Sequence, residues 1–138
     1  MDIKKSSGLI FHPTSLPSKY GIGDFGKDSY EFIDLLSTTG TKVWQVLPLG
    51  ITDNVEYSPY SSKSSILGNP YIVSLENLEN ELLKEEDFEL FKNLPKDYVD
   101  FASVYALKND LFKKLEKKIN IKENVYQNFL QDDEIRKH

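Results

Sequence analysis

The part of the sequence most able to do chemistry is a loop near the N-terminus that carries His12, Thr14, Ser15 and Asp24. A serine close to a histidine suggests a nucleophilic pair, but the loop lacks both a nucleophile elbow and an acid placed to orient the histidine. Hydroxyl, imidazole and carboxylate groups together suit a neutral polyhydroxyl ligand better than a phosphate. The loop therefore predicts a polar binding surface, with His12 as a hydrogen-bonding residue that shapes it.

The same loop contains the stretch Gly-Ile-Gly-Asp-Phe-Gly-Lys at 21–27, which looks like two phosphate-binding signatures at once. A dinucleotide fingerprint begins directly after a strand, whereas nine residues separate Gly21 from the apolar run at 8–11. A P-loop requires Ser or Thr after its lysine, and that position is Asp28. Nucleotide binding is thus disfavoured. We expect the glycines to let the loop turn tightly over the mouth of a sheet, where α/β proteins bind ligands.

A strand, a helix and a second strand are predicted to position this loop. The apolar run 8–11 predicts a short buried strand, and 42–50, rich in β-branched and aromatic residues, predicts another. Between them we expect a helix from Asp28 to a stop at Gly40, with an apolar face of Phe32, Leu35 and Leu36. Two strands joined by a helical crossover predict an α/β fold with a parallel sheet.

The second half of the chain predicts helices. A long polar loop at 57–71 and a short extended piece at 72–75 come first, and leucines at helical spacing and the pair Phe88 and Phe91 then mark short helices. Asp100 is the expected N-cap of a longer helix with an apolar stripe from Phe101 to Ile119. Its lysines are expected on a solvated face: Lys113, Lys114, Lys117 and Lys118.

The composition excludes several classes of function. A formal net charge of -5 argues against a nucleic-acid partner, and the absence of cysteine excludes disulfides and thiolate metal sites. No run approaches the roughly 20 apolar residues of a membrane span, and the first residues do not form a signal peptide. We expect a cytoplasmic protein with no nucleic-acid or membrane partner, and we predict no metal or cofactor.

The end of the sequence indicates a longer protein. A helical stripe at Val125, Phe129 and Leu130 is followed by neither Gly nor Pro. Two strands with one crossover also cannot bury both faces of a parallel sheet. We therefore expect the chain to be the N-terminal piece of something larger.

Four short motifs make the sequence recognisable in combination. They are His-Pro-Thr-Ser-Leu-Pro at 12–17, Gly-Ile-Gly-Asp at 21–24, Trp-Gln-Val-Leu-Pro-Leu-Gly at 44–50 and Ser-Pro-Tyr at 58–60. Together they closely resemble the opening of the amylomaltases, the 4-α-glucanotransferases also called disproportionating enzymes. The resemblance runs from about Ser6 to Leu78, and a weaker one covers residues 99–115.

The resemblance implies a (β/α)₈ TIM barrel, with residues 1–75 as its first two β/α units and residues 76–138 as the start of a mainly helical insertion. It implies transfer of α-1,4-glucan segments between maltooligosaccharides with retention, which uses two carboxyl groups about 5–5.5 Å apart. In this family both groups lie on later strands, so no catalytic residue is expected here, Asp53 and Glu56 included. Maltooligosaccharides and the remainder of the barrel are the implied partners.

The resemblance also implies which residues contact the sugar. Tyr60 takes the position of the family tyrosine that faces bound glucan, and Ser58 lies two residues before it. An aromatic ring can cover the apolar side of a pyranose while its hydroxyl bonds at the edge. His12 and Asp24 complete the predicted substrate-binding set, with the alternatives that His12 only shapes the cleft and that Asp24 caps the following helix.

Some positions depart from the family pattern or have other expected roles. The stretch before Ser-Pro-Tyr is one residue longer than usual, so Tyr57 cannot be equated with the family tyrosine that marks an extra glucan contact outside the cleft. Ser61 stands where glutamine is usual, and Ser74 replaces a common aspartate. Trp44 is expected in the core, and Gln45 is expected to be either wall or ligand.

Two other classes of function stay open on the sequence alone. The chain could be a non-enzymatic carbohydrate-binding module that retains the sugar-contacting loops. It could also be a helical interaction protein, a reading suggested only by residues 76–135, which leaves the motifs unexplained. Under the enzyme hypothesis, the isolated 138 residues show no transfer on maltotriose, while the full-length reading frame disproportionates it.

Overall fold

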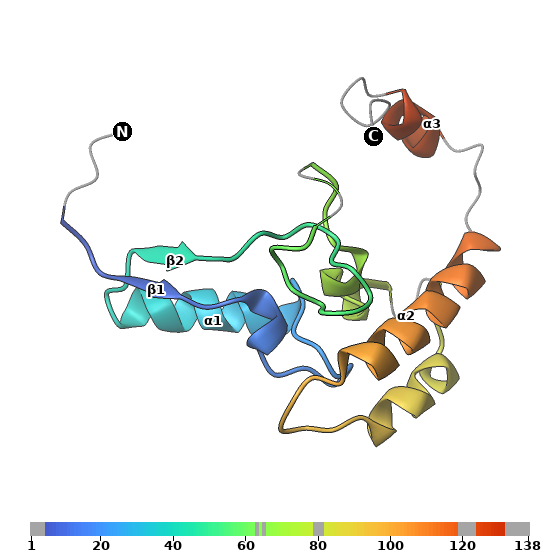
Figure 1. Ribbon diagram of the computed structural model, residues 1–138, viewed down its shortest axis with the longest axis horizontal. Helices are drawn as coiled ribbons and strands as arrows, with labels where there is room; N and C mark the ends of the chain where they lie inside the picture. The colour runs from blue at the N-terminus through green and yellow to red at the C-terminus, as the bar shows by residue number, and fades with distance from the viewer. Residues whose placement is uncertain (1–4, 63, 65, 79–81, 119–123, 132–138) are drawn as a thin grey trace.

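The computed structural model describes residues 5–62, 64, 66–78, 82–118 and 124–131 (Figure 1). Two short strands, β1 (Gly8–Ile10) and β2 (Val43–Gln45), pair in parallel. Helix α1 (Lys27–Thr38) connects them. The prediction of an α/β fold with a parallel β-α-β unit is confirmed.

Helix α1 lies along the two strands (Figure 1) and packs on them through aromatic side chains. The Phe32 ring is 5.2 Å from the Phe11 ring and 5.1 Å from the Trp44 ring. Trp44 Nε1 also donates a hydrogen bond of 2.7 Å to the Phe11 carbonyl oxygen. The helix stops as predicted at Gly40, whose φ of +76° is a left-handed conformation that glycine adopts without strain.

The strands are shorter and less buried than predicted. Leu9 and Ile10 are 40% and 63% exposed. The prediction of a buried strand at 8–11 is wrong for this chain, because the sheet has two strands within the described residues and α1 packs on only one side of them. For the same reason Leu35, which was predicted for the apolar face of α1, is 57% exposed.

The second half is helical, as predicted, but much of it is 3₁₀-helix. Short 3₁₀ segments η1 (Pro13–Ser15), η2 (Pro70–Ile72) and η3 (Glu76–Leu78) precede a longer one, η4 (Glu85–Asn93). Helices α2 (Phe101–Glu116) and α3 (Asn124–Leu130) follow.

The prediction of an extended piece at 72–75 is wrong for Ile72, which ends a 3₁₀ turn, whereas Val73 has extended backbone angles. Asn69 Oδ1 accepts a hydrogen bond of 2.9 Å from the Tyr71 backbone N–H. Pro70 fixes its own φ near the helical value. Together these two residues start the 3₁₀ turn η2 in place of a strand.

Helix α2 begins as predicted. Asp100 Oδ1 accepts a hydrogen bond of 3.1 Å from the Ser103 backbone N–H, which caps the helix. The four lysines predicted on a solvated face are all exposed. Lys108, in the middle of the same helix, is instead fully buried, which the sequence did not predict. Ile119, the last residue of the predicted stripe, lies outside the described residues.

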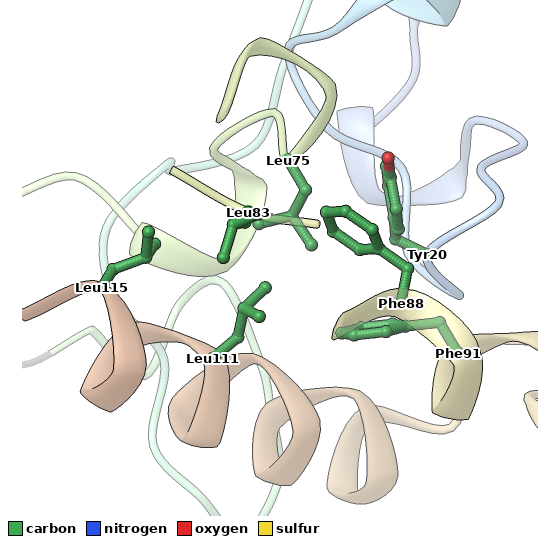
Figure 2. Packing of buried hydrophobic residues seen from close by; sticks show 7 residues of the cluster. All are labelled: Tyr20, Leu75, Leu83, Phe88, Phe91, Leu111 and Leu115. Atoms are coloured by element: carbon green, nitrogen blue, oxygen red, sulfur yellow. The ribbon is translucent and has the colours of Figure 1, made fainter. Parts of the chain in front are cut away.

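The core lies between the N-terminal loop and α2. Figure 2 shows its first cluster, in which side chains from four segments meet: Tyr20, Leu75, Leu83, Phe88, Phe91, Leu111 and Leu115. The second cluster is formed by Ile22, Tyr71, Val104 and Tyr105. Both clusters take residues from each side of position 75, and the predicted division of the chain at that position stays a prediction. This packing fixes the N-terminal loop against α2 and so positions the candidate site.

Candidate functional site

A pocket of ≈ 180 Å³ lies beside the segment that follows β2, and residues Leu47 to Gly50 of this segment line it. The loop after β1 forms one side with His12, Thr14 and Ser15, and Asn69, Ile72, Phe101 and Tyr105 form another. The carboxyl ends of parallel strands are where α/β proteins bind ligands. The pocket therefore lies where the strand order predicted a site.

His12 is held at the pocket by a short local network. It is the N-cap of η1, and its Nδ1 is 2.7 Å from Thr14 Oγ1 and accepts a longer bond of 3.3 Å from the Thr14 N–H. Accepting at Nδ1 leaves the proton of the neutral ring on Nε2. Nε2 is buried and has no hydrogen-bond partner among the described residues. A buried polar atom without a partner calls for a ligand or water, and His12 lines the pocket.

The electrostatics of His12 favour this donor role. Burial lowers the pKa of His12, and the nearby Pro48 carbonyl opposes that shift without meeting the geometry of a hydrogen bond. The ring is therefore neutral at pH 7. No hydrogen bond joins the side chains of His12 and Ser15 in the described part of the chain: Nδ1 contacts Thr14, and Nε2 has no partner. The arrangement supports ligand binding and not a Ser–His nucleophile.

The Ser-Pro-Tyr turn lies beside this pocket. Pro59 lines it, while the Tyr60 side chain is 74% exposed. Ser58 shapes the turn: its Oγ accepts a bond of 3.3 Å from the Tyr60 N–H, and its carbonyl accepts one of 3.0 Å from the Ser61 N–H. The turn thus presents the Tyr60 ring to the surface next to the pocket that contains His12.

Asp53 supports the segment that leads into the turn. Its Oδ1 accepts hydrogen bonds from the backbone N–H groups of Val55, Glu56 and Tyr57, at 2.9, 2.7 and 3.2 Å. These bonds lower the pKa of Asp53. A carboxylate that accepts three local N–H groups shapes its own loop. The expectation that Asp53 has no catalytic role stays a prediction.

An aromatic wall closes the far side of the pocket. The Tyr57 ring stacks on Phe101 with ring centres 5.5 Å apart and meets Tyr105 edge-on at 5.1 Å. The Tyr105 hydroxyl lies 2.8 Å from Thr52 Oγ1. These wall residues were not among the predicted site residues, although Phe101 and Tyr105 belong to the predicted apolar stripe of α2.

Asp24 lies away from the pocket. It is 8% exposed, and its Oδ1 accepts a bond of 2.7 Å from the Gly26 N–H. Burial raises the pKa of Asp24, and the Lys108 charge opposes the rise. Gly26 is the N-cap residue of α1, so Asp24 shapes the chain just before the helix. The structure brings His12 and the Ser-Pro-Tyr turn together but not Asp24, whose predicted sugar contact stays a prediction.

The glycines of the 21–27 stretch serve close packing. Gly21 has a φ of +75°, which favours glycine. A Cβ atom on Gly23 would overlap the Pro13 carbonyl oxygen, and the Gly23 N–H donates a bond of 3.1 Å to the Thr14 carbonyl. The expectation of a tightly turned loop is confirmed.

The described residues form a second hollow, but they hold neither a metal-binding group nor a membrane-spanning helix. A wider hollow of ≈ 860 Å³ lies between the N-terminal loop and the segment before α2, but neither His12 nor the Ser-Pro-Tyr turn lines it. Within the described ranges, no group of three or more His, Asp or Glu side chains could hold a metal ion. No helix of that part of the chain is long and apolar enough to span a membrane.

Comparison with known proteins gives consistent matches. The 4-alpha-glucanotransferase family profile matches residues 11–136. The chloroplastic/amyloplastic 4-alpha-glucanotransferase of Solanum tuberosum is 40% identical over 120 residues, covering 84% of this chain and 20% of the potato protein. That of Aquifex aeolicus is 44% identical over 110 residues, covering 78% of this chain and 22% of the relative.

A solved structure matches almost the whole chain. It is an amylomaltase from Streptococcus agalactiae in complex with acarbose, with a TM-score of 0.83 and 33% identity. The match covers 95% of this chain and 27% of the streptococcal protein. The chain therefore spans about a quarter or less of the length of the proteins it resembles.

Proposed function

The chain belongs to the 4-alpha-glucanotransferase family, and we propose that it forms part of an enzyme that transfers α-1,4-glucan segments between maltooligosaccharides with retention of configuration. The observation that carries this proposal is the match of 95% of the chain to one solved amylomaltase. The acarbose in that amylomaltase supports a sugar as the ligand of this chain as well.

We further propose that β1, α1 and β2 belong to the first two β/α units of a (β/α)₈ barrel, within residues 1–75. Residues 76–138 would then begin a mainly helical insertion. A whole barrel takes about 250 residues, so other parts of the protein would supply the remaining strands. The exposed Leu9 and Ile10 of β1 and the exposed Leu35 of α1 support this, because they are surfaces that neighbouring strands and helices would cover.

The pocket and the turn beside it supply sugar contacts in this proposal. The exposed face of Tyr60 covers the apolar side of a pyranose, and its hydroxyl bonds at the ring edge. Ser58 holds the turn that presents the ring, and its Oγ is within reach of the same sugar. His12 donates from Nε2 to a sugar hydroxyl. The aromatic wall of Tyr57, Phe101 and Tyr105 keeps water from that side of the cleft, which favours transfer to an acceptor over hydrolysis.

The two catalytic carboxyl groups are proposed to come from parts of the protein outside this chain. Retaining transfer needs two such groups about 5–5.5 Å apart, one as nucleophile and one as acid/base. The carboxylates of Asp24 and Asp53 are engaged by backbone N–H groups of their own loops, which supports their exclusion. The chain alone would then bind sugar weakly and catalyse nothing.

Chromatography of maltotriose digests tests the proposal. The protein encoded by the complete reading frame should convert maltotriose into longer and shorter glucans, and the 138-residue chain should leave it unchanged. Failure of the complete protein would refute the proposed transfer. Activity of the chain alone would show that the carboxyl groups were wrongly assigned.

Calorimetry with maltoheptaose separates the alternative of a non-enzymatic binding module. A module should bind the sugar in isolation about as tightly as the complete protein does, whereas part of a barrel should lose most of the affinity. The comparisons do not favour the module, because the matched relatives are transferases by name. Location in the cytoplasm stays a prediction, since the potato relative is a plastid protein.

A further inference from the structure

Lys108 is a buried charged residue that does not line the pocket. It is 0% exposed, in the middle of α2. Its Nζ donates a hydrogen bond of 2.6 Å to the Tyr71 carbonyl oxygen and lies 3.5 Å from the Val73 carbonyl oxygen. Burial lowers the pKa of Lys108 to about 8, although the Asp24 carboxylate opposes the shift.

The residues that Lys108 holds form one wall of the pocket. The Tyr71 ring stacks on Tyr105 with ring centres 3.5 Å apart, and the Tyr71 hydroxyl donates a bond of 3.0 Å to Asn109 Oδ1. Asn69 and Ile72, which belong to the same segment as Tyr71, line the pocket together with Tyr105. A side chain that ties the Tyr71 and Val73 carbonyls to α2 therefore sets the position of that wall.

The charged groups that act on Lys108, directly or through Asp24, come from elements other than α2. Asp24, in the loop before α1, interacts electrostatically with Lys108. Asp28 in the first turn of α1 and Glu76 in η3 act on Asp24 in turn. A buried ammonium group is costly to desolvate, and removing only one partner of a buried ion pair is destabilising. Replacing a whole buried ion pair by apolar residues, however, is often neutral for stability. Stability alone therefore does not account for this lysine.

We propose that Lys108 is a positioning residue, which clamps the segment 69–73 to α2 and so fixes the pocket wall that faces the sugar. The clamp itself is independent of the reaction. Its effect on sugar binding rests on the proposed function. Two kinds of measurement are therefore needed, and one of them does not depend on activity.

Amide hydrogen exchange measures the clamp directly. In the complete protein, Lys108→Met should lower the protection factors of the Tyr71 and Ile72 amides at least tenfold, while the Phe11 amide, which bonds to Gln45 across the sheet, keeps its protection. Lys113→Met is the matched control, because Lys113 is exposed on the same helix and paired with Asp110. Unchanged protection at 71–72, or an equal loss at Phe11, would overturn the proposal.

Kinetics on maltotriose measure the consequence for binding. Lys108→Met should raise KM at least fivefold and leave kcat within twofold, while Lys113→Met behaves like the wild type. A role limited to overall stability would instead reduce the active fraction, and so lower kcat at constant KM. That result, or an unchanged KM, would contradict the proposal.

The pH dependence of KM is a further test, and its second variant, Asp24→Asn, can be used if Lys108→Met fails to fold. A charged donor bonds more strongly than a neutral one, so the wild-type KM should rise above pH 8 and the rise should be absent in Lys108→Met. Asp24→Asn removes the charge that supports the ammonium form and should move the rise to lower pH. A rise that Asp24→Asn leaves in place would overturn the proposal. If the wild type shows no transfer at all, the proposed function fails. The protection factors of the Tyr71 and Ile72 amides in the same variants then decide the role of Lys108.

Discussion

The β1–α1–β2 unit and the packing around α2 both contain apolar side chains but bury them very differently. In the first region Ile10 and Leu35 are more than half exposed. In the second, Leu75 and Val104 are 0% exposed. An apolar pattern therefore determines which element forms, whereas burial of its apolar side chains depends on whether another element packs against them. Under the proposed function, the partners of the first region are the other strands and helices of the barrel.

The largest expected effect separates these two regions by stability. In the 138-residue chain, Leu75→Ala should lower the free energy of unfolding by about 2–5 kcal/mol, because it leaves a cavity in the core. Leu35→Ala should change it by about 0.5 kcal/mol or less, as an exposed substitution does. Urea denaturation measures both. Equal losses would show that the two regions do not differ as described, whereas a larger Leu35→Ala loss in the complete protein would support its burial by barrel neighbours.

The second effect concerns the loop between β1 and α1, which packs against α2. Gly23→Ala should destabilise the chain by about 1–3 kcal/mol, because the new Cβ overlaps the Pro13 carbonyl and forces the backbone to shift. Gly68→Ala is the matched control, since no atom lies within 4 Å of its Cβ position. Thermal denaturation of both variants checks this. A Gly23 variant as stable as the control would refute the close packing that holds η1 and His12 in place.

The third effect tests whether the two regions meet at a sugar site. Tyr60→Ala should lower kcat/KM of the complete protein for maltotriose about tenfold, which corresponds to about 1.4 kcal/mol of lost contact. Tyr30→Ala is the control, because Tyr30 is similarly exposed, at 66%, but lies on α1. If both tyrosines gave the same kinetics, the role proposed for the Ser-Pro-Tyr turn would be lost.

The smallest effect is the difference between the pKa values of two carboxyl groups, those of Asp53 and Asp24. The pKa of Asp53 lies below the ordinary 3.8 because three N–H groups stabilise its charge, so its contribution to stability is lost as pH falls through that lowered pKa. Burial raises the pKa of Asp24 above 3.8, so the folded state takes up this proton first and gains stability as pH falls through the raised pKa. NMR titration of the carboxyl carbons should therefore find Asp24 titrating at higher pH than Asp53. The reverse order would refute both assignments.

Local signals in the sequence predicted much of the fold. The alternation of strand, helix and strand, the stop at Gly40 and the Asp100 cap each depend on residues close together in the chain. The 3₁₀ turn at Pro70–Ile72 was missed, although its signal was present, because Asn69 followed by Pro70 favours a capped turn over a strand.

What the sequence could not predict depends on contacts between distant segments. The burial of Lys108 needs the Tyr71 carbonyl, which is 37 positions away, and nothing in its helical spacing distinguishes it from exposed lysines. The bond between His12 and Thr14 is local, but the burial of the unpartnered Nε2 atom depends on segments distant in the sequence. Motifs therefore indicated the site, and tertiary contacts determine which of its atoms are free to bind.

The most direct test of the central claim is a crystal structure of the complete protein with a bound maltooligosaccharide. We expect a pyranose on the face of Tyr60 and a sugar hydroxyl within hydrogen-bond distance of His12 Nε2. We also expect two carboxyl groups at the reacting carbon, both from outside residues 1–138. A sugar bound away from Tyr60 and His12, or an Asp or Glu of this chain at the reacting carbon, would contradict the claim.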